Sequence, residues 1–531
     1  MSEILKFWPF SDKEPRESQL FGFDWLVNQD KKYLFLESPV GSGKSALAMA
    51  YSGFLNQGRG SSYILTPQRI LQQQYETSFR RELLFSLYGK SNYECVSKNT
   101  DCSIGCNTPP ACEFCSHKAA LSSAIASPNL VMNYKLALLH FAYLPLLDKR
   151  QLMVLDECHS LEKELIAFDS LEISAYHCSK YGIKFKPFKQ ISDAYTWVID
   201  EYQDKVEDIF HDMQDKIATL KNKNFLNPDE ITMMKDFEKL ERYIKTIFSF
   251  TAYSLKEVQE KYVLVNDGKS FFEFKKLFAK DQFNKIVKPK ADKFLFMSAT
   301  ILDQKGYCRD LGIDPKEAAF VSLKSEFEPK NRPVYFMPSL KMNSKWKDDN
   351  NEKSREALIN KVFGLLDLHK EHSGIIHTGN FEVAKWLISK LENNIDHRIF
   401  HHIPSDNDEE KTDRNNTINN FMECRKPALL ISPSITEGLD LKHDLSRFAI
   451  FVKIPFGYLG DQWIKARMDL STEWYQRMAL IDVMQGCGRV VRSTDDWGNV
   501  YILDGSWAYL LSQTSGRIPE WWFDSYCEYE D

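Results

Sequence analysis

Short, mainly apolar runs alternate along this chain with longer segments of helical period. In the first half, the runs lie at 33–36, 62–65, 130–134, 151–155 and 293–297. A second series follows residue 325, with runs at 374–377, 428–431, 448–452 and 500–503. Runs of this length are typical of strands buried on both faces of a parallel sheet. The pattern therefore predicts two α/β domains, each built on a parallel sheet.

A different pattern separates two of these strands. Over 191–220, apolar residues recur at every third or fourth position, which predicts one long amphipathic helix. A second run with the same period covers 231–247, after an Asn-Pro-Asp break. Two long helices without strand signals predict a helical insertion rather than further helices of the sheet layers.

These changes of pattern predict how the chain is divided. The first α/β domain is expected to combine three segments, 1–90, 129–165 and 291–324. Insertions at 91–128 and 166–290 interrupt it, and 325–531 is expected to form the second α/β domain. We expect the two domains to share one nucleotide.

The segment 37–45, Glu-Ser-Pro-Val-Gly-Ser-Gly-Lys-Ser, joins the first predicted strand to an apolar helix. In that context glycines let backbone N–H groups surround a polyphosphate, and the helix N-terminus adds partial positive charge. Lys44 is expected to reach the β- and γ-phosphates, and the Ser45 hydroxyl to bind Mg²⁺. Ser38 replaces the first glycine of the usual Gly-x4-Gly-Lys-Ser pattern, and the alternative is a glycine-rich turn without a ligand. The strand and helix favour a nucleoside triphosphate site, to which we assign Gly41, Ser42, Gly43, Lys44 and Ser45.

An acidic pair follows the predicted strand 151–155. Asp156 at this position is suited to hold Mg²⁺, and Glu157 is suited to polarise a water molecule that attacks the γ-phosphate. A weaker feature lies upstream of the glycine-rich loop, where Gln19 ends an Arg-x-x-Gln element. We expect its side-chain amide to face an adenine edge, although a glutamine on a helix surface is common.

Near the C-terminus, the segment 485–492 reads Gln-Gly-Cys-Gly-Arg-Val-Val-Arg. It places Arg489 and Arg492 three residues apart on a predicted helix. Arginine is always charged and pairs bidentately with phosphate oxygens, so both side chains suit the charge of a γ-phosphate in hydrolysis. The alternative is an arginine pair on the protein surface.

Five of the eleven cysteines lie within 21 residues, whereas the other six are scattered singly. The five are Cys95, Cys102, Cys106, Cys112 and Cys115. Such a distribution indicates metal ligands rather than core residues or a disulfide framework. Four thiolates hold either an iron–sulfur cluster or zinc, and spacing alone does not choose between them.

Composition and charge add three expectations. The chain has no apolar run long enough for a membrane helix and no secretory signal at its start, so we expect an intracellular protein without a membrane partner. The net charge of −6 neither indicates nor excludes nucleic acid. Two lysine-rich segments with interleaved aromatics, 180–189 and 271–294, have the composition of a single-strand groove, and the alternative is a solvated face.

Taken together, these residues resemble a superfamily 2 DNA helicase of the iron–sulfur XPD/DinG-like family. The family's motifs occur in order over nearly the whole chain, at 37–45, 66–74, 156–159, 298–300, 374–380, 436–440 and 485–492. Members of the family carry a cysteine-liganded cluster before the third of these motifs and a helical Arch after it. This chain has a cysteine-rich insertion and a helical insertion in those places.

The resemblance implies two RecA-like motor domains that use Mg-ATP to translocate 5′→3′ on single-stranded DNA and to unwind a forked duplex. Carried over by position, it assigns ATP and Mg²⁺ to Lys44, Ser45, Asp156 and Glu157, and further nucleotide contacts to Gly438 and Asp440. It assigns closure of the site to Gln485, Arg489 and Arg492, and coupling to the DNA path to His159. Cys158 stands where the family usually has alanine, a small residue in both cases.

The family pattern also favours a [4Fe–4S] cluster held by Cys95, Cys102, Cys106 and Cys112. Because Cys112-Glu-Phe-Cys115 is itself a Cys-x-x-Cys element, Cys115 is the alternative fourth ligand. Zinc remains the alternative metal.

We therefore expect an ATP-dependent DNA helicase. One alternative is an RNA helicase, because the ATPase motifs do not report the sugar. Another is a DNA-stimulated ATPase subunit that does not unwind, and a more distant one is a small-molecule kinase. The sequence does not indicate a cellular pathway or a protein partner.

Overall fold

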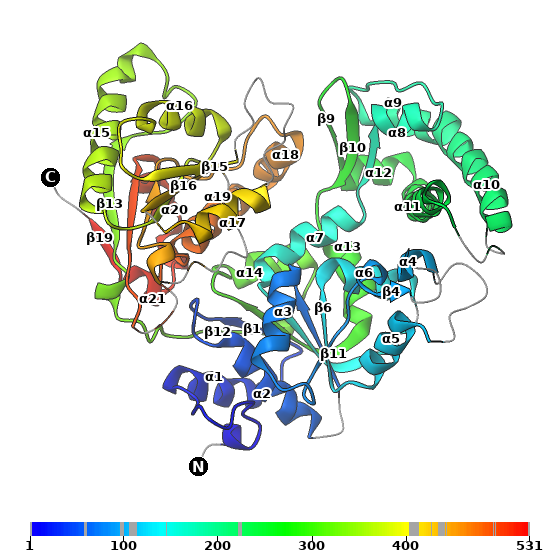
Figure 1. Ribbon diagram of the computed structural model, residues 1–531, viewed down its shortest axis with the longest axis horizontal. Helices are drawn as coiled ribbons and strands as arrows, with labels where there is room; N and C mark the ends of the chain where they lie inside the picture. The colour runs from blue at the N-terminus through cyan, green and yellow to red at the C-terminus, as the bar shows by residue number, and fades with distance from the viewer. Residues whose placement is uncertain are drawn as a thin grey trace.

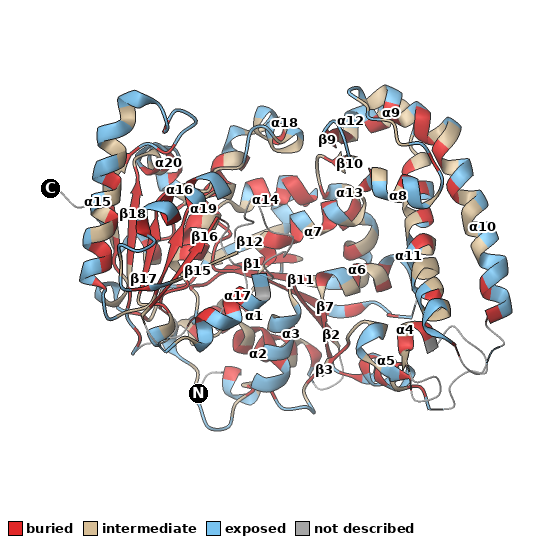
Figure 2. Ribbon diagram, turned by 45° about the horizontal axis from the view of Figure 1, so that its top comes forward, coloured by how far each residue is buried: buried red, intermediate tan, exposed pale blue. Residues whose placement is uncertain are grey.

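The computed structural model describes residues 3–57, 61–95, 100–105, 114–144, 146–220, 223, 226–402, 414–425, 427–433, 441, 443–491, 493 and 495–528. Two parallel sheets form the cores of two α/β domains, and both insertions extend from the first domain (Figure 1). Figure 2 shows the central strands of both sheets buried, whereas the long helices of the second insertion are exposed along much of their length. The predicted fold class is confirmed.

The first sheet carries seven described strands in the order β12-β1-β11-β7-β2-β6-β3. Their bounds are β1 (Tyr33–Glu37), β2 (Ser62–Thr66), β3 (Phe85–Ser86), β6 (Asn129–Asn133), β7 (Arg150–Asp156), β11 (Ala291–Ser298) and β12 (Ala318–Ser322). The helices around it are α1 (Glu17–Val27), α2 (Lys44–Asn56), α3 (Arg69–Ser78), α6 (Tyr134–Tyr143), α7 (Leu161–Phe168), α13 (Lys280–Gln282) and α14 (Gln304–Leu311). In parallel register β11 lies between β1 and β7, so the loops after these three strands meet at one edge.

The second sheet carries seven described strands in the order β15-β16-β14-β17-β18-β13-β19. Their bounds are β13 (Val334–Leu340), β14 (Gly374–His377), β15 (Arg398–His401), β16 (Ala428–Ser432), β17 (Phe448–Phe451), β18 (Asn499–Asp504) and β19 (Tyr526–Glu528). The helices are α15 (Glu352–Leu368), α16 (Phe381–Leu391), α17 (Arg414–Glu423), α18 (Gln462–Leu470), α19 (Thr472–Cys487), α20 (Ser506–Thr514) and α21 (Glu520–Phe523).

The central strands match the apolar runs because they are buried on both faces. The edge strands were not predicted, since their half-exposed residues produce no continuous apolar run. The edge strand β12 has no buried residue. The strand β13, which lies between β18 and β19, was also not predicted, because it is interrupted by Pro338, which cannot donate to a neighbouring strand.

The cysteine-rich insertion contains β4 (Glu94–Cys95), β5 (Thr100–Asp101), α4 (Cys102–Gly105) and α5 (Ser116–Ala126). The second insertion, which we call the Arch, contains both predicted long helices. The first is α9 (Ile191–Trp197) and α10 (Gln203–Leu220), joined by a π-helical segment, Val198–Tyr202, and the second is α11 (Pro228–Thr251). A capping box of Asn227 and Glu230 starts α11.

The Arch also holds an antiparallel sheet that the sequence pattern did not predict. Its strands are β8 (Leu171–Ser174), β9 (Tyr262–Asn266) and β10 (Phe271–Lys276), in the order β8-β10-β9, and α8 (Ala175–Lys180) and α12 (Leu255–Lys261) lie beside them. Phe272 and Phe274 are fully buried in the Arch core. These two rings are therefore not available for the base stacking that we expected of 271–294.

Several lysines of the two basic segments are bound within the Arch. Lys180 pairs with Asp236 at 2.9 Å, and Lys186 pairs with Glu201 at 2.6 Å. Lys276, which is 1% exposed, forms an ion pair with Asp169. These three lysines are held by carboxylates of the Arch, and Lys276 belongs to neither a single-strand groove nor a solvated face.

The two insertions touch each other away from the sheets. Ile104 of α4 packs against a buried apolar cluster from the far ends of the Arch helices, formed by Ile217, Leu220, Leu226 and Met234. Lys235 of α11 lies 3.7 Å from the carboxylate of Asp101. Figure 1 shows α10 and α11 reaching from the Arch toward α4. The contact joins the two insertions at a point remote from the sheet that carries them both.

Candidate active site

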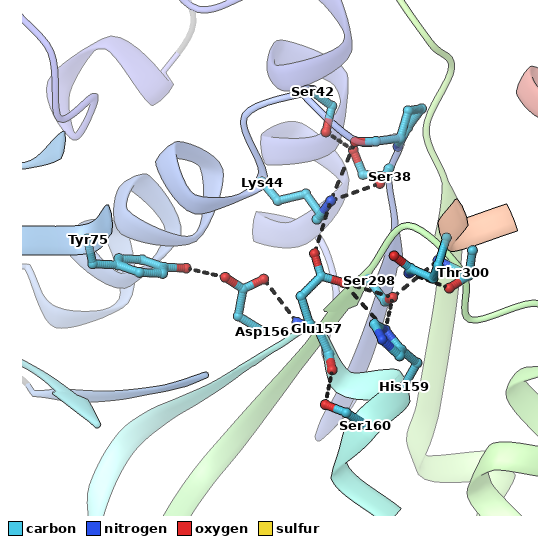
Figure 3. A network of polar contacts seen from close by, with 12 residues as sticks. Ser38, Ser42, Lys44, Tyr75, Asp156, Glu157, His159, Ser160, Ser298 and Thr300 are labelled. Atoms are coloured by element: carbon cyan, nitrogen blue, oxygen red, sulfur yellow. Dashed lines mark hydrogen bonds and ion pairs between the residues drawn. The ribbon is translucent and has the colours of Figure 1, made fainter. Parts of the chain in front are cut away.

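The glycine-rich loop connects β1 to α2 at the edge of the first sheet. Gly41 and Gly43 have φ angles of 76° and 81°, in the left-handed region that favours glycine. Ser38, which replaces the usual first glycine, donates from its hydroxyl to Ser42 Oγ at 2.6 Å. Lys44 Nζ donates to the Ser38 carbonyl at 3.2 Å and therefore lies over the loop (Figure 3).

Gln19 reaches this loop from α1. Its amide nitrogen donates to the Ser42 carbonyl at 2.8 Å, and its amide oxygen accepts from the Arg16 backbone N–H at 2.8 Å. A Cβ built on Gly43 would lie 2.2 Å from the Gln19 amide nitrogen, so glycine is required there for space as well as for φ. Both ends of the amide are thus bound to protein backbone, and Gln19 lines the cleft described below. Its contact with an adenine edge stays a prediction.

Asp156 ends β7 beside the loop and is almost fully buried. Its carboxylate accepts from the Tyr75 hydroxyl at 3.0 Å and from the Glu157 backbone N–H at 3.1 Å. Burial, and then the negative charge of Glu157, raise the pKa of Asp156, while Lys44 opposes that shift. Carboxylate and hydroxyl oxygens are the ligands that Mg²⁺ prefers, so Asp156 and Ser45 fit a magnesium ion in this cleft.

Glu157 has a φ angle of 48°, unusual for a residue with a side chain. The turn directs its carboxylate into the cleft, 3.9 Å from Lys44 Nζ and 3.4 Å from His159 Nδ1 (Figure 3). His159 Nδ1 also lies 2.8 Å from Ser298 Oγ, at the end of β11. The end of β7 is thereby linked to the end of β11 through a histidine.

The second domain enters the same cleft through the end of α19. Gln485, 7% exposed, donates to the Thr300 hydroxyl at 2.8 Å. Arg489 is buried and lines the cleft, but α19 ends at Cys487 with Gly488 as its C-cap. Arg489 is therefore not on the helix that we predicted for it, because the chain leaves the helix at the glycine.

A cleft of about 670 Å³ lies between the glycine-rich loop and the second domain. Its lining includes Lys44, Ser45, Asp156, Glu157, Gln485 and Arg489, so residues more than 300 positions apart face one space. The segment after β2 also lines it through Pro67 and Gln68, at the carboxyl end of a parallel strand.

Several lining residues were missed by sequence reasoning. Tyr75 and the aromatic residues Trp8, Phe10 and Phe79 face the cleft. Phe10 and Phe79 stack with ring centroids 5.4 Å apart. An aromatic residue in a helix or near a terminus is most often a core residue, so no local signal distinguished them.

Of the five clustered cysteines, the structure describes three. Cys95, Cys102 and Cys115 are buried together, with Tyr93 packed against them. Cys115 is the N-cap of α5, and Ser116 Oγ lies 3.5 Å from Cys102 Sγ. Among the described residues no group of three or more possible ligands is arranged around a single metal ion. Three cysteines buried in one cluster still provide soft donors of the kind that an iron–sulfur cluster requires.

The remaining predicted site residues lie outside the described part of the chain. They are Cys106 and Cys112 of the cysteine group, Gly438 and Asp440 of the fifth motif, and Arg492.

Two parallel α/β domains that face each other across one cleft, with a glycine-rich loop on the first, define the RecA-like two-domain class. Comparisons with known proteins place the chain more narrowly. Residues 366–525 match the family described as the helicase C-terminal domain. The XPD/RAD3 helicase subunit of general transcription and DNA repair factor IIH from Saccharomyces cerevisiae is 30% identical over 105 residues. The ATP-dependent DNA helicase YoaA of Escherichia coli K12 is 30% identical over 102 residues.

These matched segments cover 18% of this chain in both cases, and only 13% and 16% of the yeast and bacterial proteins. Among solved structures, one of an XPD helicase covers 97% of this chain and 100% of its own, with a TM-score of 0.60 and 14% identity. S. tokodaii Xpd4 has a TM-score of 0.57, with 12% identity and the same coverage of both chains. The resemblance to XPD/DinG-like superfamily 2 helicases is confirmed, and the likeness to solved structures extends over the whole fold.

Among the described helices, none combines the length with the apolar character that a membrane span requires.

Proposed function

We propose that this protein is an ATP-dependent DNA helicase that translocates 5′→3′ on single-stranded DNA and unwinds forked duplex. The observation that carries the proposal is the cleft in which Gln485 and Arg489 of the second domain face Lys44, Asp156 and Glu157 of the first. A nucleotide bound there would be contacted from both domains. Its hydrolysis would change how the two domains are held together, which is what a motor needs.

For hydrolysis, each residue has a role that its position suits. Lys44 compensates charge on the β- and γ-phosphates, and Ser45 and Asp156 hold Mg²⁺, which neutralises phosphate charge when bound. Glu157 orients a water molecule and accepts its proton as the water oxygen bonds to the γ-phosphorus. The bond from phosphorus to the bridging oxygen breaks, and ADP leaves with the electron pair. Arg489 stabilises the charge that develops on the transferred group.

The link through His159 supports coupling of this site to the DNA. Glu157 directly follows strand β7 and Ser298 ends β11, and His159 lies within 3.4 Å of both side chains. A change in charge or position at Glu157 would therefore reach the end of β11. The contact between the Arch and the cysteine-rich insertion supports a path for one DNA strand between these two insertions and the first domain.

We further propose that the cysteine-rich insertion holds a [4Fe–4S] cluster. Support comes from the buried convergence of Cys95, Cys102 and Cys115. Bound there, the cluster would fix the fold of an insertion whose described strands are two residues long. An intracellular location follows from these assignments.

The test is hydrolysis by the full-length protein and by Lys44→Ala. Removing the ammonium group should abolish ATP hydrolysis, whereas normal hydrolysis by the variant would reject the motor assignment. Stimulation of wild-type ATP hydrolysis by single-stranded DNA would support the proposal. Stimulation of ATP hydrolysis by RNA alone would support an RNA helicase. Stimulated hydrolysis without strand separation on a fork with a 5′ overhang would support an ATPase subunit that does not unwind.

A further inference from the structure

Helix α19 contacts the first motor domain near both of its ends. At its C-terminal end Gln485 donates to Thr300 beside the nucleotide cleft. Two turns earlier, roughly 12 Å along the helix, Arg477 contacts the first domain again. This second contact contains no residue that lines the nucleotide cleft.

Arg477 is 3% exposed and is bound to α14. One of its terminal nitrogens pairs with Asp310 at 2.5 Å, and the other lies 3.7 Å from Asp303. Asp303 is also the N-cap of α14, where its carboxylate accepts from the Gly306 N–H at 2.9 Å. Because α14 follows Thr300 within the chain, Arg477 binds the same segment that Gln485 reaches.

Arg467 of α18 completes the buried network. It pairs with Glu162 of α7 at 2.8 Å and lies 3.5 Å from Asp310. Trp474 of α19 donates from its indole N–H to Glu162 at 3.3 Å, and its ring lies 4.6 Å from the Arg467 guanidinium. Arg467, Asp310 and Trp474 are all at most 5% exposed. Since α7 follows Asp156-Glu157 and α14 follows Thr300, the network binds the two helices that begin shortly after the ends of β7 and β11.

Helix α18 of the second domain also contacts the base of the Arch. The indole N–H of Trp463 donates to the Lys276 carbonyl at 2.6 Å, and a guanidinium nitrogen of Arg467 donates to the Leu277 carbonyl. Gln462 exchanges hydrogen bonds with the Asn266 backbone at 3.4 and 3.5 Å. Figure 1 shows α18 facing β9 of the Arch.

A buried ion network is a poor source of net stability, since removing its charges from water is costly. The network instead fixes orientation, because the planar guanidinium donates hydrogen bonds to carboxylates only along fixed directions. Here that direction sets the angle of α19 against α7 and α14. A small rotation about this point would move Gln485 and Arg489 away from the nucleotide.

We propose that Arg477 and Arg467 are positioning residues for ATP hydrolysis, holding α19 so that Gln485 and Arg489 meet the nucleotide bound by the first domain. The inference rests on the proposed function for its effect on rate, and it also makes a prediction for the nucleotide-free protein.

The kinetic test uses Arg477→Met in the full chain with saturating single-stranded DNA. We expect kcat to fall by about tenfold or more with KM for ATP nearly unchanged, because misplacement of the reacting groups affects the transition state more than ground-state binding. Arg477→Lys should recover most of the lost kcat. The matched control is Gln476→Leu, which removes a buried side chain of α19 that donates only within the second domain, to Tyr509 at 3.2 Å. It should lower stability without changing kcat. Equal effects of Arg477→Met and Gln476→Leu would reject the inference.

Because Arg477 is buried and its loss can affect folding, the more exposed Arg309→Ala provides a second variant. Arg309 has a half-exposed side chain and donates to Ser471 at 3.4 Å, across the same junction. Arg309→Ala should also lower kcat with KM for ATP nearly unchanged, but by a smaller factor than Arg477→Met. An unchanged kcat would overturn the inference.

Hydrogen exchange of residues 478–487 without nucleotide separates this inference from the proposed function. We expect Arg477→Met or Arg309→Ala to speed exchange there and Gln476→Leu to leave the C-terminal end of α19 protected. Unchanged exchange in both arginine variants rejects the positioning role whether or not the wild-type protein hydrolyses ATP. Absence of hydrolysis by the wild type rejects the proposed function alone.

Discussion

The side-chain amide of Gln485 donates to the hydroxyl of Thr300 at 2.8 Å, and this single bond links the two RecA-like domains beside the nucleotide cleft. The two residues are 185 positions apart. Gln485 lies in the last turn of the helix that leads to Arg489, and Thr300 follows the strand that His159 contacts through Ser298. The closure of the two domains that we propose would therefore be connected to the ends of β7 and β11 by short, direct contacts.

The first prediction concerns this bond. Gln485→Ala should lower kcat/KM for ATP hydrolysis by roughly fivefold, the value of one neutral hydrogen bond. Thr300→Val removes the other partner and should cause a similar loss. If the bond is the cause, the double variant should lose little more than either single variant. Additive losses would show that the two side chains act separately. Steady-state ATPase assays measure all four proteins.

The second prediction concerns the cysteine group. Cys95, Cys102 and Cys115 are buried together. We therefore expect serine at any of them to reduce the iron and sulfide content and the cluster's absorbance at about 400 nm. Anaerobic purification with metal analysis is the measurement. Cys178→Ser is the matched control, because Cys178 is an equally buried free thiol in the Arch core. Full iron content in Cys115→Ser would indicate that Cys112, not Cys115, is the fourth ligand. Zinc without iron would reject the iron–sulfur assignment.

The third prediction concerns the contact between Arch and cysteine-rich insertion. Met234→Asp places a charge in a buried apolar cluster, and the cost of burying it should open the contact. We expect ATP hydrolysis stimulated by circular single-stranded DNA to rise relative to that stimulated by linear DNA. The reason is that a circular strand has no free end and cannot easily enter between the two insertions while their contact is closed. Thr232→Asp adds the same charge at an exposed position of α11 and should leave the ratio unchanged. An unchanged ratio in folded Met234→Asp would refute a gating contact.

The fourth prediction concerns pH. Burial lowers the pKa of His369 to about 4 and of His377 to about 3, and the charges of neighbouring His372 and Arg489 act in the same direction. Both imidazoles are neutral in the folded protein, whereas the unfolded chain binds protons near pH 6.5. The unfolded state thus binds more protons below that pH, so stability should fall progressively from about pH 6.5 toward pH 4.

Thermal unfolding at a series of pH values measures this effect. His369→Gln keeps a polar group near Tyr501, to which His369 is bound at 2.9 Å, and should flatten the pH dependence. His211→Gln, at an exposed position of α10, should have the same pH dependence as the wild type. A flat profile for the wild-type protein would contradict the assignment of neutral buried histidines.

Local patterns were sufficient where the chain has to satisfy a local requirement. Central strands such as β1 and β7 are buried on both faces, so their apolar runs are readable without the fold. The loop before Lys44 needs glycine at positive φ, and Asp156-Glu157 follows a buried strand, so both features appear in the sequence. By contrast, β12 and the Arch sheet are half exposed or carry mixed residues, and no period distinguishes them from loops.

The sequence by itself thus determined the two parallel sheets, the glycine-rich loop, the acidic pair and the existence of a cysteine group. Only the tertiary structure decided which distant side chains meet. Tyr75 reaches Asp156, Cys115 packs with Cys95 and Cys102, and Arg467 binds Glu162 across more than 300 residues. The physical reason is that secondary structure follows from neighbours along the chain, whereas these contacts depend on the angles between separately formed elements. Side chains that meet through such angles have no signature in the spacing of residues along the chain.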